Sequence, residues 1–306
     1  MASEFRKLSF QYVRHERAES LLAFLLRRFR YHSAAEWTAL IQSGAVTVNS
    51  HQAPPEHVLL SRERIVYVPP PKPEPPVDAR YTLLYEDASV LAVSKSANIP
   101  TSPSGKYWHN CLRHVLQRDL QISELHAVHR LDRETSGVNL FAKTRRAAAV
   151  LGQAFAAGTV EKRYAAVLRG SLPCRDTLVS APLRDAEGEV HIKQGVHPQG
   201  KPSVTRFILR ARLPGASLVD VLPTTGRTHQ IRAHAAFLGL PVWGDRLYGV
   251  PAADFLAWLH DPNRDLTSSH LLHSKCLVFV HPESGERVVV GSDEGRLVRE
   301  WVGKSG

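Results

Sequence analysis

The residues of this chain best suited to chemistry lie between positions 129 and 137, in the sequence His-Arg-Leu-Asp-Arg-Glu-Thr-Ser-Gly. Asp132 is a carboxylate between cationic side chains, and an ionised carboxylate can act as a base or as a nucleophile. A solvated helical turn with Arg130 and Glu134 paired at i and i+4 is one interpretation. No apolar periodicity of helical kind runs through these residues, however, and the alternation after Gly137 predicts a strand. The sequence therefore favours a loop that leads into a strand, where functional side chains commonly lie.

The pattern His-Arg-Leu-Asp-x-x-Thr-Ser-Gly in this segment resembles the signature of the RluA-type pseudouridine synthases. In that family the aspartate is the catalytic residue, so the resemblance implies that Asp132 is the catalytic carboxylate. It also implies that the rest of the chain supplies a grip on RNA, a pocket for uracil and a partner that keeps Asp132 ionised.

The segment Thr225–His234 resembles the Gly-Arg-x-His-Gln-Ile/Leu-Arg segment of the same family, whose first arginine pairs with the catalytic aspartate. That arginine is Arg227 here, and its predicted place is the first turn of a helix, where a cation opposes the helix dipole. Fold stability gives little reason for it, whereas an arginine beside an aspartate lowers the carboxyl pKa by ~1–3 units. The predicted helix has a buried face that turns away from Arg227 and His234. Its members are Ile231, Ala235 and Leu238.

Tyr164 belongs to Lys162-Arg163-Tyr164, which resembles the Lys-x-Tyr element of the family, and the tyrosine of that element contacts the target uracil. A ring stacked on a flipped base contributes roughly 1–3 kcal/mol. The strand predicted from Val160 to Leu168 would by itself favour a core tyrosine, and the resemblance favours the uracil contact. The predicted catalytic residues are therefore Asp132, Arg227 and Tyr164.

Candidate RNA contacts lie near the signature and in the N-terminal part of the chain. Arg130 is suited to fill the gap that an extruded uridine leaves in its stack, because flipping costs roughly a few kcal/mol. Three arginines cluster at the end of the first predicted helix. They could bind RNA, and they could equally be there because the helix dipole favours cations at a C-terminus. The candidate RNA-binding residues are His129, Arg130, Arg232, Arg27, Arg28 and Arg30.

The reaction that the resemblance implies places few demands on the protein. Uridine becomes pseudouridine when the bond from uracil nitrogen to the sugar breaks, the base turns over, and a carbon of the base rejoins the sugar. No atoms or electrons are exchanged with another molecule, so neither a cofactor nor a metal is expected. A glycosidase normally uses two carboxylates, but here the leaving base returns as the nucleophile and one suffices. Asp132 could attack the anomeric carbon or remove the neighbouring sugar proton, and either role requires its ionised form.

His126, His129 and Asp132 are spaced by three, and histidines with a carboxylate could hold zinc. Because the segment is not predicted to be helical, the three side chains would not share a face. His129 is better interpreted as a hydrogen-bonding structural residue. The same interpretation applies to His229, His273 and His281.

The length of 306 residues favours two domains, or one large domain with an appendage, and a composition of 43% hydrophobic and 22% charged residues is that of a soluble globular protein. The net charge of +10 favours a polyanionic partner such as nucleic acid. No apolar run is long enough to span a bilayer, and the first residues lack the apolar core of a signal peptide. The three cysteines are far apart in the sequence and offer neither a disulfide framework nor a metal motif. A cytoplasmic location without a membrane or an obligatory protein partner is expected.

The N-terminal part predicts a small helical and β module. Ser20 can cap a helix to about Phe29, and Ser33 to Glu36 has the form of a capping box for a second helix. Strands are predicted at 46–48 and 64–68. Two helices followed by a small hairpin resemble, over roughly residues 15–68, the RNA-binding module first known from a ribosomal small-subunit protein and called the "S-four" module.

Six prolines between Pro69 and Pro76 predict an extended spacer. The expected organisation is an RNA-binding module at 1–68, a linker at 69–79, and a catalytic domain at 80–306. In the last of these, paired strands alternate with helices, for example at 203–212 with 217–222 and at 271–281 with 286–290. This pattern predicts an α+β fold on a mixed or antiparallel sheet.

The sequence is thus interpreted as an RNA pseudouridine synthase, an isomerase acting on specific uridines in rRNA or tRNA by base flipping. Two rival functions are kept. One is a non-catalytic RNA-binding protein of the same fold, and the other is a metal-dependent nucleic-acid hydrolase.

Overall fold

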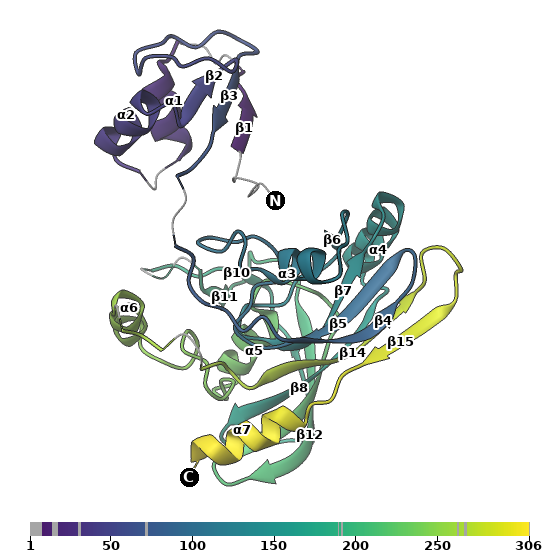
Figure 1. The fold of residues 1–306 in the computed structure, drawn as a ribbon. Helices are drawn as coiled ribbons and strands as arrows, with labels where there is room; N and C mark the ends of the chain where they lie inside the picture. Colours follow the sequence, from purple (N-terminus) through teal and green to yellow (C-terminus); the bar gives the residue numbers. More distant parts are fainter. Residues whose placement is uncertain are drawn as a thin grey trace. The chain divides into compact units, whose positions relative to one another are not determined.

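The computed structural model describes residues 8–13, 18–29, 32–70, 73–188, 190, 192–261, 263–265 and 268–305. The chain divides into two compact units, Met1–Pro73 and Glu74–Gly306. Figure 1 shows both units.

The first unit is a three-stranded sheet packed with two helices. Its elements are β1 (Leu8–Gln11), α1 (Leu21–Arg28), α2 (Ala34–Gln42), β2 (Val46–Val48) and β3 (Arg64–Tyr67). Both predicted helix caps are present, since Ser20 Oγ accepts the Ala23 N–H and Ser33 with Glu36 forms a capping box. Strand β1 was not predicted, and it pairs antiparallel with β3 to give the order β1–β3–β2. Fully buried Leu25, Trp37 and Ile41 form the centre of its core.

The second unit is built on one large sheet with helices packed around it (Figure 1). Its strands are β4 (Tyr81–Glu86), β5 (Val90–Lys95), β6 (His126–Ala127), β7 (Ser136–Ala142), β8 (Glu161–Arg169), β9 (Asp176–Ser180), β12 (Val204–Leu213), β13 (Ala216–Pro223), β14 (Leu272–Val280) and β15 (Arg287–Gly291). A separate pair is β10 (Leu183–Asp185) with β11 (Gln194–Val196). The helices are α3 (Leu112–Asp119), α4 (Arg145–Ala157), α5 (Gln230–Phe237), α6 (Ala252–His260) and α7 (Gly295–Ser305).

The main path of the sheet runs β4–β5–β7–β14–β8–β13–β12–β9, with β6 on β7 and β15 on β14. The β7–β14 pair is parallel, and the other described pairs of this sheet are antiparallel. The prediction of an α+β fold on a mixed sheet is confirmed.

The centre of this sheet positions the segment with the signature. Gly137, at the start of β7, lies opposite Ser274 of β14, and Ser274 lies opposite Tyr164 of β8. Gly137 has φ +103°, and a Cβ built on it would lie 2.2 Å from the Ser274 carbonyl oxygen. The glycine is therefore required for the close approach of two backbones, which brings the segment before β7 towards Tyr164.

Two predicted boundaries are wrong. The linker is shorter than 69–79, because Glu74 already belongs to the second unit. Its carboxylate accepts the backbone N–H groups of His109 and Asn110 at 2.8 and 2.7 Å, and Ser96 Oγ donates to the Asp78 carbonyl at 2.5 Å. Helix α5 begins at Gln230 and not at Arg227, because the Gln230 side chain accepts the Arg227 N–H at 3.0 Å and so closes a turn ahead of the helix.

Candidate active site

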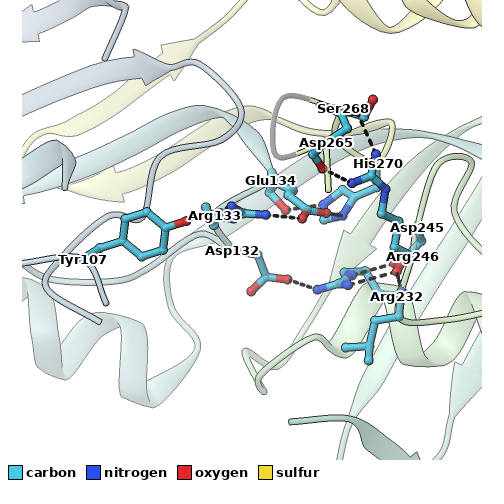
Figure 2. A network of polar contacts seen from close by, with 12 residues as sticks. Tyr107, Asp132, Arg133, Glu134, Arg232, Asp245, Arg246, Asp265, Ser268 and His270 are labelled. Carbon is cyan, nitrogen blue, oxygen red and sulfur yellow. Dashed lines mark hydrogen bonds and ion pairs between the residues drawn. The ribbon is translucent and has the colours of Figure 1, made fainter. Parts of the chain in front are cut away.

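Asp132 lies in the loop before β7, and two donors face one of its carboxylate oxygens. Arg232 Nη1, from α5, donates to Asp132 Oδ2 at 2.9 Å (Figure 2). His229 Nε2, at the start of α5, lies 3.8 Å from the same oxygen. Among the residues that the structure describes, Oδ1 has no hydrogen-bond partner. That oxygen is therefore the one available to react.

The guanidinium of Arg232 is held on its other side by Asp245. Nε and Nη2 of Arg232 donate to the two oxygens of Asp245 at 2.6 and 3.0 Å (Figure 2). Asp245 Oδ1 also accepts the backbone N–H groups of Leu247 and Tyr248 at 2.9 and 3.0 Å. Arg232 is 6% exposed and Asp245 is 1% exposed. A buried guanidinium fixed in this bidentate way leaves one N–H group aimed at Asp132.

The arginine predicted to pair with Asp132 is the wrong one. Arg227 lies before α5, is exposed, and donates from Nε to the Pro202 carbonyl at 3.4 Å. Arg232 was predicted to contact RNA, and in the structure its guanidinium is bound to the carboxylates of Asp132 and Asp245. Both arginines occur in the matched segment, so the correct choice depended on where the helix begins.

The charge state of Asp132 follows from this arrangement. Burial raises the carboxyl pKa, but Arg232, His229 and His270 oppose that effect, and they hold the pKa of Asp132 at about 2. Asp132 is therefore ionised at neutral pH, as its predicted role requires. The pKa of Arg232 is raised above its ordinary value, since Asp245 and Asp132 outweigh the cost of its burial.

Asp132 and Tyr164 line one cavity of 380 Å³. Tyr164 is 9% exposed, and burial raises the pKa of its phenol to about 12, so the hydroxyl stays protonated. The cavity wall also includes cationic side chains, namely Arg130, Lys162 and Arg227. Burial and the neighbouring Arg227 lower the pKa of Lys162, whose Nζ donates to the Thr225 carbonyl at 3.1 Å. An anionic carboxylate, an aromatic ring and a cationic rim thus share one cavity.

A second polar network fixes the loop that carries Asp132. Arg133 donates to the Tyr107 hydroxyl at 2.9 Å and to Glu134 at 2.7 Å (Figure 2). His270 lies 3.4 Å from Glu134 and forms a 2.8 Å hydrogen bond with Thr135 Oγ1. Burial raises the pKa of Glu134, but His270, Arg133 and Arg232 bring it down to about 2. Glu134 therefore serves as an ionised anchor of the loop.

The histidines that were predicted to be structural differ in their roles. His129 Nε2 accepts the Leu140 N–H at 2.9 Å, its ring stacks on Phe155, and burial lowers its pKa to about 3. His273 and His281 hydrogen-bond to Ser136 and Asp87 at 2.9 and 2.8 Å, as that prediction expected. His229 is the exception, because it faces Asp132. His229 lies in the matched segment Thr225–His234, whereas no motif pointed to Asp245, Tyr248 or His270.

The three segments that form the site lie inside one range that matches a known family. A family model described as RNA pseudouridylate synthase matches residues 89–237. The ribosomal large subunit pseudouridine synthase C of Haemophilus ducreyi is 32% identical over 290 residues, which cover 90% of this chain and 88% of that protein. The chain belongs to this family.

Two further comparisons limit how far the likeness extends. The pseudouridylate synthase RPUSD2 of Homo sapiens is 34% identical over 230 residues, which are 75% of this chain but 42% of that protein. The chain thus spans less than half the length of that relative. The solved structure of human RNA pseudouridylate synthase domain containing 1 has a TM-score of 0.57 and 26% identity, and the match covers 72% of this chain and 86% of that one.

The remaining RNA-binding candidates lie in two settings. Arg130 is exposed on the cavity rim. Arg27 donates twice to Glu19, at 2.6 and 3.1 Å, and Arg28 lies over the rings of Phe10 and Phe29. Arg30 lies outside the described residues.

No described helix is long and apolar enough to cross a membrane.

Proposed function

We propose that this chain is an RNA pseudouridine synthase in which Asp132 is the catalytic carboxylate. The observation that supports this most directly is the ionised carboxylate of Asp132, kept anionic by Arg232 at the wall of a cavity that also contains Tyr164. An ionised carboxylate is what both candidate first steps require, whether attack at the anomeric carbon or removal of the neighbouring sugar proton.

The state of the neighbouring carboxyls supports an isomerisation over a hydrolysis. Hydrolysis of a glycosidic bond needs a second carboxyl that donates a proton to the leaving group. Glu134 and Asp245 are the nearby candidates, and both are ion-paired with pKa values below the ordinary range, so neither holds a proton at neutral pH. In the proposed reaction the uracil leaves from its nitrogen, stays in the cavity above Tyr164, and returns through carbon to the same sugar.

The substrate that we propose is ribosomal or transfer RNA, with the target uridine flipped into the cavity. The relatives support rRNA, because the Haemophilus ducreyi protein is a ribosomal large subunit pseudouridine synthase. The charge of +10 and the cationic rim of the cavity favour a polyanion. Arg130 is suited to enter the stack that the flipped base leaves. The first unit would act as an RNA-binding module, and a cytoplasmic location would fit such substrates.

Tritium release from RNA labelled at uracil C5 tests the proposal, because that position loses its hydrogen when it bonds to the sugar. The wild-type chain should release tritium from rRNA or tRNA transcripts, and Asp132→Asn should release none while it binds the same RNA. Tight binding without release by the wild type would favour the non-catalytic rival. Strand cleavage that a chelator abolishes would favour the metal-dependent hydrolase.

A further inference from the structure

Tyr248 contacts both donors that face the catalytic carboxylate. The guanidinium carbon of Arg232 lies 5.1 Å from the centroid of its ring, and its hydroxyl lies 3.2 Å from His229 Nδ1. Tyr248 is 2% exposed, and its backbone N–H is bound to Asp245. The ring therefore has a fixed position from which it can orient the groups around Asp132.

The direction of the hydrogen bond between Tyr248 and His229 follows from a third residue. The backbone N–H of Gln194 donates to the Tyr248 hydroxyl oxygen at 2.8 Å, so this oxygen is already an acceptor and its own proton needs a separate acceptor. His229 Nδ1 is in place for that proton. Burial raises the pKa of the tyrosine above its ordinary value, which keeps the proton on its oxygen.

The tautomer of His229 is then determined. Burial lowers the pKa of this histidine in spite of the opposing charge of Asp132, so the ring is neutral at pH 7. A neutral imidazole that accepts at Nδ1 carries its proton on Nε2, and Nε2 is the atom that lies 3.8 Å from Asp132 Oδ2. This distance is long for a hydrogen bond, but such contacts commonly tighten when substrate binds.

The backbone of His229 adds an independent observation. The residue has φ +53° and immediately precedes α5, a left-handed conformation that is uncommon for residues other than glycine. Strained backbone of this kind persists where the surrounding structure holds it, and it occurs frequently in active sites. In this conformation the imidazole lies between Tyr248 and Asp132.

We propose that Tyr248 is a positioning residue for the reaction, which directs the Nε2–H of His229 at Asp132 Oδ2 and so leaves Oδ1 as the reacting oxygen. The opposite tautomer would place a nitrogen lone pair against the carboxylate. The role of Tyr248 rests on the function proposed above, because it concerns that reaction at that site.

Tyr248→Phe in the full-length chain tests this role, since it removes the hydroxyl and keeps the ring. We expect kcat for tritium release to fall about 3- to 10-fold, the value of one hydrogen bond, with RNA affinity unchanged. In nitrogen-15 spectra, His229 of the wild type should be protonated on Nε2, and in the variant its proton should be shared between both nitrogens. Tyr85→Phe is the matched control, because it removes a hydroxyl that donates to Asp87 at 2.8 Å. It should leave kcat unchanged.

A double variant shows whether Tyr248 acts through His229. Asparagine tolerates the left-handed conformation, so His229→Asn preserves the backbone. Adding Tyr248→Phe to His229→Asn should cause no further loss of kcat. An equal loss in both backgrounds, or a wild-type His229 protonated on Nδ1, would overturn the proposal. A wild type that modifies no RNA would refute the proposed function instead, and the spectra would still decide the tautomer.

Discussion

At Asp132 two opposing effects act on one carboxyl group, and their sum decides whether it can react. Burial favours the protonated acid, while Arg232 and two histidines favour the anion and hold the pKa at about 2. The cation is effective because Asp245 fixes two of its N–H groups and leaves Nη1 for Asp132. Geometry as well as charge is therefore required of the partner, and this requirement separates arginine from lysine.

Arg232→Lys should lower kcat about 100-fold, because one ammonium group cannot bridge Asp245 and Asp132 with the present geometry. Arg227→Lys keeps an exposed cation on the cavity rim and should change kcat only slightly. Single-turnover kinetics on the same RNA, with thermal melting to confirm folding, would compare the two. Equal losses of kcat in both variants would contradict the assignment of Arg232, and would support the sequence-based prediction that Arg227 pairs with Asp132.

The pH dependence of kcat should be flat on the acid side. Asp132 stays ionised until the pH approaches its pKa of about 2, so kcat should not decline between pH 8 and pH ~5 through protonation of this group. Initial rates across this range would measure it, with RNA in excess. An acid limb centred above pH ~5 that persists in His229→Asn would show that the reacting group is not Asp132, because that variant removes the histidine that lies 3.8 Å from the carboxylate.

Because of His129, the free energy of unfolding should decrease as the pH is lowered, and the decrease should begin at a higher pH than the titration of the carboxylates. In the unfolded chain its imidazole binds a proton below pH ~6.5, but in the folded protein its pKa is about 3. The stability is thus fully present above pH ~6.5 and is lost as the pH falls, by ~1.4 kcal/mol per pH unit for one histidine. Urea unfolding of wild type and His129→Gln between pH 6 and 4 should differ in slope by that amount. Parallel slopes would contradict a buried neutral imidazole.

At the scale of elements, the sequence predicted features that depend on neighbouring residues, such as the ends of a helix. The alanine-rich run from Arg145 to Ala157, followed by Gly158, predicts a helix, and α4 has those ends, with Thr144 as N-cap and Gly158 at φ +74°. The parallel pairing of β7 with β14 was not predictable, because it joins residues 136 and 273 and no local signal specifies that partner. The contact between Arg232 and Asp132 likewise joins residues 100 positions apart, and this is why the site was predicted only in part.

Gly137 tests the contact between those two strands. Gly137→Ala would place a Cβ 2.2 Å from a backbone oxygen at a positive φ, so we expect a loss of ~3 kcal/mol in the free energy of unfolding, or more. Gly152→Ala is the control, since its Cβ position meets no described atom within 4 Å beyond the neighbouring residues and backbone of its own helix, and alanine favours the interior of α4. It should be neutral or stabilising by up to ~1 kcal/mol. Denaturant unfolding of both variants would decide, and equal stabilities would argue against the close approach.

At the scale of the whole molecule, the boundary between the units lies inside the proline-rich segment. The prolines predicted an extended chain from 69 to 79, but they do not indicate which of these residues form hydrogen bonds with the second unit. Glu74 accepts two backbone N–H groups of the second unit, and Asn110 Nδ2 donates to the Pro75 carbonyl at 2.9 Å. These contacts place the second half of the segment in the second unit, and they determine where a truncation should be made.

Deletion of residues 1–73 should leave a folded second unit that modifies short RNA at a near-normal kcat but binds RNA more weakly. Residues 4 to 64 contain nine lysines and arginines against six acids, a surplus of three. If all three were phosphate contacts on a single strand, the salt slope of binding would fall by about 2, from ~0.7 per contact. RNA binding measured over a range of salt would test this, and unchanged affinity at every salt concentration would show that the first unit is not an RNA grip.

Deletion of residues 1–76 is the matched variant, because it also removes Glu74. It should be less stable than the shorter deletion by ~1–3 kcal/mol, since the backbone N–H groups of His109 and Asn110 lose two hydrogen bonds to a carboxylate. Equal stabilities of the two deletions would mean that the second unit begins after Pro76.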